Sequence, residues 1–316
     1  LMSLWPVAFF VLGFILLFTK KVKEIKTGKA VFKKPIRPWK IPAIVCLVLG
    51  SVFFYNNAPF SFPLYDQYHG KQGIGPFQHL IDYVNSRNGL VFWAHPEVQN
   101  DLHDNGDGIK IKTAAYYKDL LTAYNYTGYA VFAEGINYIA PPMGIWDQVL
   151  LEYCSGSRER PVWALGEVDF EADTFSIKDT QTVLLLKETN KESILNALRV
   201  GRMYAIHLYT NDAPTLYLDE FTVEGLDDIE LAYMGEEIIM DANPTINIKI
   251  SSDRENVDFK VELIRNGEII KTYNARDSIN INFDDDYYEP GEKIFYRLDI
   301  TGPCRIISNP VFVEFM

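Results

Sequence analysis

Three strand-like runs in this chain each lead to a residue of a metal-binding type, and this pattern constrains the fold more than any other feature. The runs and the residues that follow them are 90–94 (LVFWA) with His95, 129–133 (YAVFA) with Glu134, and 162–165 (VWAL) with Asp169. In barrels and open sheets of parallel strands, functional side chains gather at the carboxyl ends of the strands. The pattern predicts a divalent-cation site made from one histidine and two carboxylates.

Helical patterns alternate with these runs, which is typical of a parallel sheet covered on both faces. The helical segments are 76–87, 113–124, 145–153 and 190–200, and further strands are expected at 182–186 and 202–207. The α/β segment, residues 58–211, has roughly 150 residues, whereas a complete eight-unit barrel usually needs about 250. We therefore expect a partial or distorted TIM-like βα barrel.

Residues 212–316 have a different pattern, with short β-rich runs separated by turn signals. The runs are 216–223, 245–250, 258–265, 268–273, 279–283, 294–300 and 311–315. The dipeptide Asn266-Gly267 between two of them is a strong hairpin signal. This pattern predicts a small C-terminal β-sandwich with a structural or adhesive role.

Residues 1–57 contain two apolar stretches, 1–18 and 41–55, on either side of a basic loop. Each stretch is near the length that crosses a bilayer, the second only marginally. We expect two N-terminal transmembrane helices with the basic loop in the cytoplasm and the remaining domains outside it. A cleaved signal peptide is the alternative, although no A-x-A site follows the second stretch. The first residue is Leu rather than Met, which is typical of a fragment.

Formal charge is divided unevenly along the chain. Residues 20–40 contain nine Lys or Arg and one Glu, a charge of +8, which leaves −20 for the rest of a chain whose total is −12. An acidic domain is a poor binder of nucleic acid but is compatible with cation binding. Cys46, Cys154 and Cys304 are too dispersed for a disulfide framework or a cysteine-based zinc site.

Each candidate ligand has a plainer interpretation when it is taken alone. His95 precedes Pro96, which ends the strand, and it is equally typical of a structural histidine. Glu134 follows a buried run, where a carboxylate needs a cation or a donor, or else lies in a solvated loop. Asp169 and Glu171 lie in an acidic loop of a common kind, which also suits a hard or borderline cation.

Taken together, these segments resemble the later motifs of the PHP (polymerase and histidinol phosphatase) family of metal-dependent phosphoesterases. Residues 89–96 (GLVFWAHP) are similar to the family's strand ending in His-Pro, and 132–135 (FAEG) to its strand ending in a ligand Glu. Residues 165–171 (LGEVDFE) resemble its G-x-x-D-x-H loop, and 182–204 resemble the helix and Gly-Arg-x-Tyr-Ala strand that follow.

The resemblance implies a distorted βα barrel with two or three divalent ions, such as Zn, Mn or Fe, which activate water and hold a phosphate. It implies His95, Glu134 and Asp169 as metal ligands. The family's His-x-His and Asp-His motifs are missing, and Asp66 and His69 are the nearby substitutes. The resemblance thus covers only part of the family's metal site.

Two further residues are candidates for catalysis. Glu171 stands where the family has a histidine, and it would act as an accessory ligand or base. Arg202 suits a bidentate phosphate clamp, or else an ion pair with one of the many acidic residues.

The sequence therefore supports two functions. The first is a membrane-anchored, extracytoplasmic, PHP-like metal-dependent hydrolase with a phosphoester substrate, in contact with the lipid bilayer and not with nucleic acid. The alternative is a degenerate, non-catalytic PHP-like scaffold that serves as an extracytoplasmic binding or structural module.

Overall fold

The structure is a computed structural model that describes residues 5–56, 72–98, 102–104, 110–112, 114–132, 134–168, 176–225 and 231–316. The chain divides into two compact units, Leu1–His79 and Leu80–Met316. Helix α3 (Gly75–Asn85) crosses the division between them.

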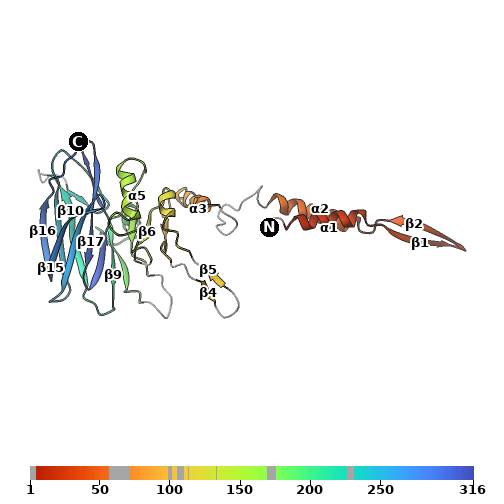
Figure 1. The fold of residues 1–316 in the computed structure, drawn as a ribbon, viewed down its shortest axis with the longest axis horizontal. Helices are drawn as coiled ribbons and strands as arrows, with labels where there is room; N and C mark the ends of the chain where they lie inside the picture. The colour runs from red at the N-terminus through yellow and green to blue at the C-terminus, as the bar shows by residue number, and fades with distance from the viewer. Residues whose placement is uncertain are drawn as a thin grey trace. The chain divides into compact units, whose positions relative to one another are not determined.

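The N-terminal unit is a helical hairpin joined by a β-hairpin. Helices α1 (Val7–Phe18) and α2 (Lys40–Tyr55) lie side by side, and strands β1 (Lys21–Thr27) and β2 (Ala30–Ile36) extend from one end of the pair (Figure 1). The strands pair antiparallel, with Thr27 opposite Ala30. Gly28, at φ +63°, provides the left-handed backbone conformation that this tight turn needs.

The prediction of two transmembrane helices is wrong. In the part of the chain that the structure describes, no helix is long and apolar enough to cross a membrane. Helix α1 has 12 residues and α2 has 16. At about 1.5 Å per residue these are shorter than the ~30 Å hydrocarbon core. The first apolar stretch, 1–18, is longer than α1 because Pro6 precedes the first turn of the helix. The second stretch, 41–55, lies entirely within α2.

The second unit begins with a small parallel sheet. Strands β3 (Phe92–Trp93), β6 (Gly128–Ala130) and β7 (Trp163–Leu165) pair in that order, and both pairings are parallel. Helices α4 (Asp119–Thr122) and α5 (Ile145–Cys154) lie between these strands in sequence, together with the hairpin of β4 (Leu102–Asp104) and β5 (Lys110–Lys112).

The expected TIM-like barrel is also wrong, since the strands that the structure describes do not close into a barrel. The next strands, β8 (Thr180–Leu184) and β9 (Met203–Leu208), pair antiparallel with each other and join a different sheet. Helix α6 (Lys191–Val200) between them ends at Gly201, where a φ of +73° turns the chain back. The other side of β9 pairs with β18, so β8 adds to the antiparallel sheet rather than extending the parallel one.

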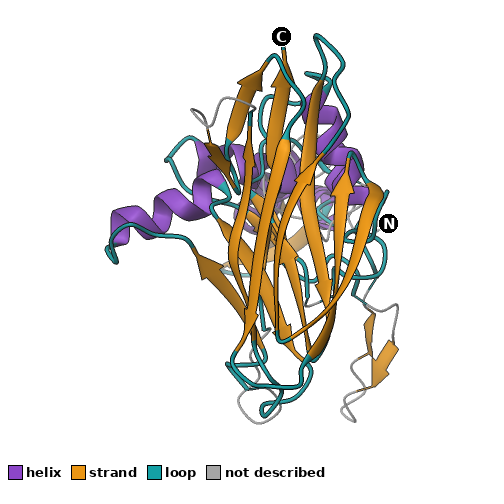
Figure 2. Ribbon diagram, turned by 90° about the vertical axis from the view of Figure 1, so that its left-hand side faces the viewer, coloured by secondary structure: helices purple, strands orange, loops and turns teal. Residues whose placement is uncertain are grey.

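Among the described residues, the remaining strands complete a single sheet of twelve, mostly antiparallel. They are β10 (Leu216–Glu224), β11 (Leu231–Tyr233), β12 (Glu237–Met240), β13 (Thr245–Ser252), β14 (Asp258–Arg265), β15 (Glu268–Arg276), β16 (Ser278–Asp284), β17 (Lys293–Thr301), β18 (Cys304–Ser308) and β19 (Val311–Phe315). Figure 2 shows these long strands running together as the largest layer of the unit. The prediction of a separate C-terminal β-sandwich is wrong as well. Strands β8 and β9 precede residue 212, where the sandwich was expected to begin, and yet they belong to the same sheet.

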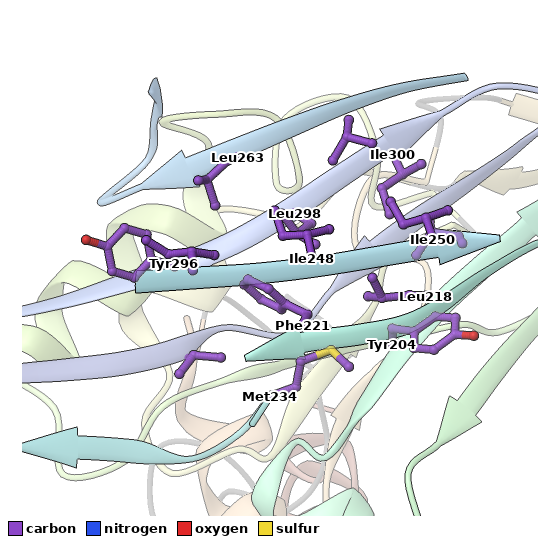
Figure 3. Packing of buried hydrophobic residues seen from close by; sticks show 14 of the residues in the cluster. Tyr204, Leu218, Phe221, Met234, Ile248, Ile250, Leu263, Tyr296, Leu298 and Ile300 are labelled. Carbon is purple, nitrogen blue, oxygen red and sulfur yellow. The ribbon is translucent and has the colours of Figure 1, made fainter. Parts of the chain in front are cut away.

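The hydrophobic core lies between strands of this sheet that face each other. Ile248 and Ile250 of β13 and Phe221 of β10 point toward Leu298 and Ile300 of β17 (Figure 3). The alternation of apolar and polar residues along β13 buries one face of that strand. Burial of each such side chain contributes about 1.5–3 kcal/mol.

Strand β17 is buried along nearly its whole length because α5 covers its other face. Arg297 of β17 binds Asp147 of α5 through two hydrogen bonds of 2.7 Å, and both side chains are fully buried. This pair ties the helix beside the parallel sheet to the centre of the large sheet.

The edge of the parallel sheet is held by a second link. The side chain of Asn309 accepts a hydrogen bond from the Ala164 N–H at 2.8 Å and donates to the Ala164 and Met203 carbonyls. Strand β7 is therefore fixed against β9, and the carboxyl ends of the parallel strands rest on a rigid base.

Candidate functional site

The candidate site lies at the carboxyl edge of the parallel sheet, where three segments leave their strands. His95 follows β3, Glu134 follows β6, and Glu167 follows β7. Because the strands are parallel neighbours, these three segments meet at one edge. The Val131 N–H donates to the Leu165 carbonyl at 2.9 Å, which continues the pairing toward that edge.

Two of the predicted ligands have a left-handed backbone. His95 has φ +40° and Glu134 has φ +58°. Such a conformation is uncommon for residues other than glycine and costs about 1–3 kcal/mol, and it is concentrated at functional sites. Gly135 follows Glu134, and a Cβ there would lie 2.3 Å from the Ala130 carbonyl oxygen, so this tight turn requires glycine.

The side chains of His95 and Glu167 lie close together. Nδ1 of His95 is 3.9 Å from Oε1 of Glu167, and each side chain is about a third exposed, at 32% and 31%. The pair is therefore accessible from solvent while its other side is packed.

Tyr116 brings a hydroxyl group to the same edge. Its hydroxyl donates a hydrogen bond to the Ala94 carbonyl, next to His95. Burial, followed by the negative charges of Glu167 and Glu134, raises the pKa of Tyr116 to about 12. The side chain stays protonated at neutral pH, and both carboxylates lie near enough to influence it.

Glu97 organises the loop that carries Glu134. Its carboxylate, in a residue only 7% exposed, accepts hydrogen bonds from the N–H groups of Asn137, Tyr138 and Ile139 at 2.7–2.8 Å. The N–H of Glu97 donates to the Glu134 carbonyl at 2.6 Å. A buried carboxylate needs such donors, so Glu97 has a positioning role.

Four predicted site residues lie outside the described residues: Asp66, His69, Asp169 and Glu171. The predicted ligand set of His95, Glu134 and Asp169 therefore stays a prediction. In the described segments, no three His, Cys, Asp or Glu side chains form a group that could hold a metal ion.

Arg202 lies away from this edge. It follows Gly201, which packs against Trp163 at the beginning of β7, whereas Glu167 follows the end of that strand. Its guanidinium forms an ion pair with Glu236. The structure thus does not bring Arg202 together with His95.

Sequence reasoning did not select Tyr116, Glu97 or Glu167 as members of the site. Glu97 and Glu167 follow the ends of β3 and β7 within a few residues, so their distance from the strand ends was a usable signal. Tyr116 comes from a segment without such a signal, and only the folded chain brings it to Ala94.

A cavity near these strands lies at the opposite edge of the parallel sheet. It has a volume of about 310 Å³, and its lining includes Thr127, Arg160 and Arg199. These residues precede β6, precede β7 and end α6, so they face the amino ends of the parallel strands. Chemistry in parallel sheets collects at the carboxyl ends, and we do not assign the function to this cavity.

The resemblance to the PHP family implies a divalent metal ion, and the described residues bring two donors of suitable type, His95 and Glu167, together at this edge. Imidazole and carboxylate are the ligands of zinc, manganese and iron. The 3.9 Å between His95 and Glu167 is compatible with both binding one ion at bonds of roughly 2.0–2.2 Å. A third ligand is needed for a complete site, and Glu134 and Asp169 are the predicted candidates.

Comparison with known proteins found no match among protein-family models and none among curated proteins. The resemblance to the PHP family therefore stays a prediction that rests on the quoted motifs alone.

Proposed function

We propose that the chain is a metal-dependent hydrolase that acts on a phosphoester at the carboxyl edge of β3, β6 and β7. The main support is the close approach of His95 and Glu167, 3.9 Å apart, at the edge where Glu134 also leaves its strand. These residues are distant in sequence, so the fold and not a local motif brings them together.

Each residue has a defined part in this proposal. A divalent ion lowers the pKa of a bound water and stabilises negative charge on phosphate oxygens. His95 and Glu167 would hold the ion, with Glu134 or Asp169 completing the set. Glu97 would keep the Glu134 turn in place through its three backbone hydrogen bonds. Tyr116 would fix the end of β3 through Ala94.

The second candidate function is a non-catalytic scaffold. Two observations favour it: the described residues contain no complete group of three ligands, and Arg202 is engaged by Glu236. In this case the carboxyl edge of the parallel sheet would be what is left of a lost metal site, and the large sheet would carry the binding function.

Metal analysis of the purified full chain, combined with a phosphodiesterase assay, separates the two candidates. Protein purified without chelator should contain stoichiometric Zn, Mn or Fe and should hydrolyse bis-p-nitrophenyl phosphate. His95→Ala and Glu167→Ala should each lose the metal and at least about 100-fold of the activity. The matched control is His79→Ala, which changes an exposed histidine on α3 and should retain both.

The scaffold interpretation makes the opposite prediction. It requires wild-type protein without bound metal or activity, even after metal is supplied, and a His95→Ala variant with unchanged thermal stability. That combination would disprove the hydrolase.

A further inference from the structure

The outer surface of the α1–α2 pair is apolar on every side. Between Val7 and Phe18 there is no charged residue, and Lys40 at the start of α2 is the only charge on either helix. The exposed apolar side chains of the two helices are Val7, Val11, Leu12, Phe14, Ile15, Phe18, Ile41, Ile44, Val45, Val48, Leu49, Val52 and Tyr55. A helix that is hydrophobic all round is normally covered by protein or by lipid.

The two helices pack closely against each other along their shared face. A Cβ on Gly13 would lie 2.8 Å from Leu47, and one on Gly50 would lie 3.2 Å from Phe9. Ala43 in the same interface is fully buried. Close packing through small residues is typical of helix pairs in lipid. The exposed apolar side chains point away from this interface, so they need a different cover.

The β-hairpin at the end of this pair is strongly basic. Residues 20–40 carry a charge of +8, and their only acidic residue, Glu24, lies 3.7 Å from Lys33. Lys23 lies directly opposite Lys34 in the strand register. Like charges in such a cross-strand pair are destabilising, and a bound anion would relieve the repulsion.

Tryptophan residues lie at both ends of the helical pair, and one of them borders the basic hairpin. Trp39 precedes α2, and the ammonium group of Lys21 lies 5.3 Å from the centre of its ring. Trp5 packs on Phe9 and Phe53 at the other end of the helical pair. Tryptophan is enriched at the boundary between lipid headgroups and acyl chains.

Of the possible covers, only lipid accounts for both surfaces. A nucleic acid would neutralise the lysines but would leave the apolar helices in water. A second copy of the unit would cover the helices but would bring two basic hairpins together. Anionic lipid supplies acyl chains for the helices and negative headgroups for the hairpin.

We propose that residues 5–56 are a lipid-binding hairpin, in which α1 and α2 insert among acyl chains and β1–β2 binds anionic headgroups. This unit would attach the protein to a negatively charged membrane surface. The proposal is independent of the hydrolase activity, so either can fail without the other.

Flotation of the full chain with vesicles tests the headgroup contact. Wild-type protein should bind vesicles of phosphatidylcholine with phosphatidylglycerol at least tenfold more tightly than phosphatidylcholine alone, and salt should weaken the difference. Reversing charge at Lys23→Glu and Lys34→Glu should remove the difference. The control pair Lys187→Glu and Lys191→Glu makes the same change in net charge on the second unit and should leave it intact.

Tryptophan quenching by brominated phosphatidylcholine tests the insertion. Quenching should occur in wild-type protein and disappear in the Trp5→Phe, Trp39→Phe double variant, because the other tryptophans belong to the second unit. Equal quenching in both proteins would overturn the proposal. So would equal binding to neutral and anionic vesicles, or binding to single-stranded DNA that competes with vesicles.

Discussion

The two sheets of the second unit treat their charged groups in opposite ways. In and beside the twelve-stranded sheet, buried carboxylates are paired with arginines at 2.7 Å: Asp147 with Arg297, Asp285 with Arg265, and Asp299 with Arg305. At the edge of the three-stranded sheet, His95 and Glu167 stay 3.9 Å apart and partly exposed. The large sheet pairs its buried carboxylates closely, whereas the small sheet keeps this pair farther apart and partly exposed.

The backbone differs in the same direction. Strand β17 keeps its regular pairing for nine residues, whereas the parallel strands have only two or three residues each. The segments beyond β3 and β6 turn through left-handed residues, His95 and Glu134. Short strands thus give way to irregular backbone at the edge where His95 and Glu134 lie, and functional residues are often carried on such loops beside a stable scaffold.

The largest expected effect comes from breaking the buried pair of Arg297 and Asp147. Asp147→Ala leaves a guanidinium without its partner in a fully buried position, so the free energy of unfolding should fall by about 3–5 kcal/mol. Urea denaturation measures this loss. The double variant Asp147→Ala, Arg297→Met should recover much of it, because no unpaired charge remains. If the Asp147→Ala variant were as stable as wild type, the buried pair would not stabilise the large sheet, and the contrast with the small sheet would be lost.

A smaller effect of opposite sign is expected at the candidate site. Glu134→Gly relieves a left-handed backbone at φ +58° and should raise the free energy of unfolding by up to about 1 kcal/mol, while the proposed hydrolase activity falls. Asn256→Gly, at φ +62°, is the control and should gain less, since asparagine tolerates this conformation. Loss of stability at Glu134 would mean that its side chain is structural.

The stability of the packing between the two sheets should depend on pH. His207 of β9 stacks on Phe132, which follows β6, and its Nδ1 lies 2.9 Å from the Thr180 hydroxyl. Burial lowers the pKa of His207, partly opposed by Asp179. The unfolded state therefore binds a proton more readily than the folded state. Stability should be full above the ordinary pKa, about 6.5, and should fall as pH decreases below it.

Denaturation midpoints of wild type and His207→Gln across this range measure the effect. The difference between the two proteins should change with pH below about 6.5 and stay constant above it. A difference that is constant throughout would show that His207 does not contribute to the pH dependence.

The smallest effect is expected from an exposed ion pair of the large sheet. Arg276 donates two hydrogen bonds to Asp258, yet both side chains are mostly exposed. Solvent and salt screen such pairs, so Arg276→Ala should leave the denaturation midpoint within experimental error. A clear loss of stability would show that an exposed ion pair of this sheet contributes as much as a buried one.

Much of the secondary structure and the parallel direction of β3, β6 and β7 could be predicted from the sequence, but the antiparallel pairing of β8 and β9 could not. Helix α6 forms where residues 190–200 indicated it, and the Asn190 side chain caps it by accepting from the Ser193 N–H. The apolar residues of 182–186 indicate burial in a strand, which is equally true of parallel and antiparallel pairing. The partner of β9 on its other side, β18, lies a hundred residues later and decides the direction.

The candidate site was predictable to a similar extent. Apolar runs ending in His95 and Glu134 were sufficient to place both residues at strand ends. The contact of His95 with Glu167 rather than another acid depends on how the chain turns after Gly166. A Cβ on that glycine would lie 2.4 Å from the Gln181 carbonyl oxygen, so a strand of the other sheet shapes this turn.

The hydrogen bonds of Asn309 have a consequence for solubility. Strand β7 is the last strand of its sheet, and such a border presents unpaired peptide groups that can recruit another chain. By binding both the N–H and the carbonyl of Ala164, one amide side chain imitates a neighbouring strand for a single residue. Because β7 is short, cover of this one residue is sufficient, and it protects the molecule from edge-to-edge aggregation.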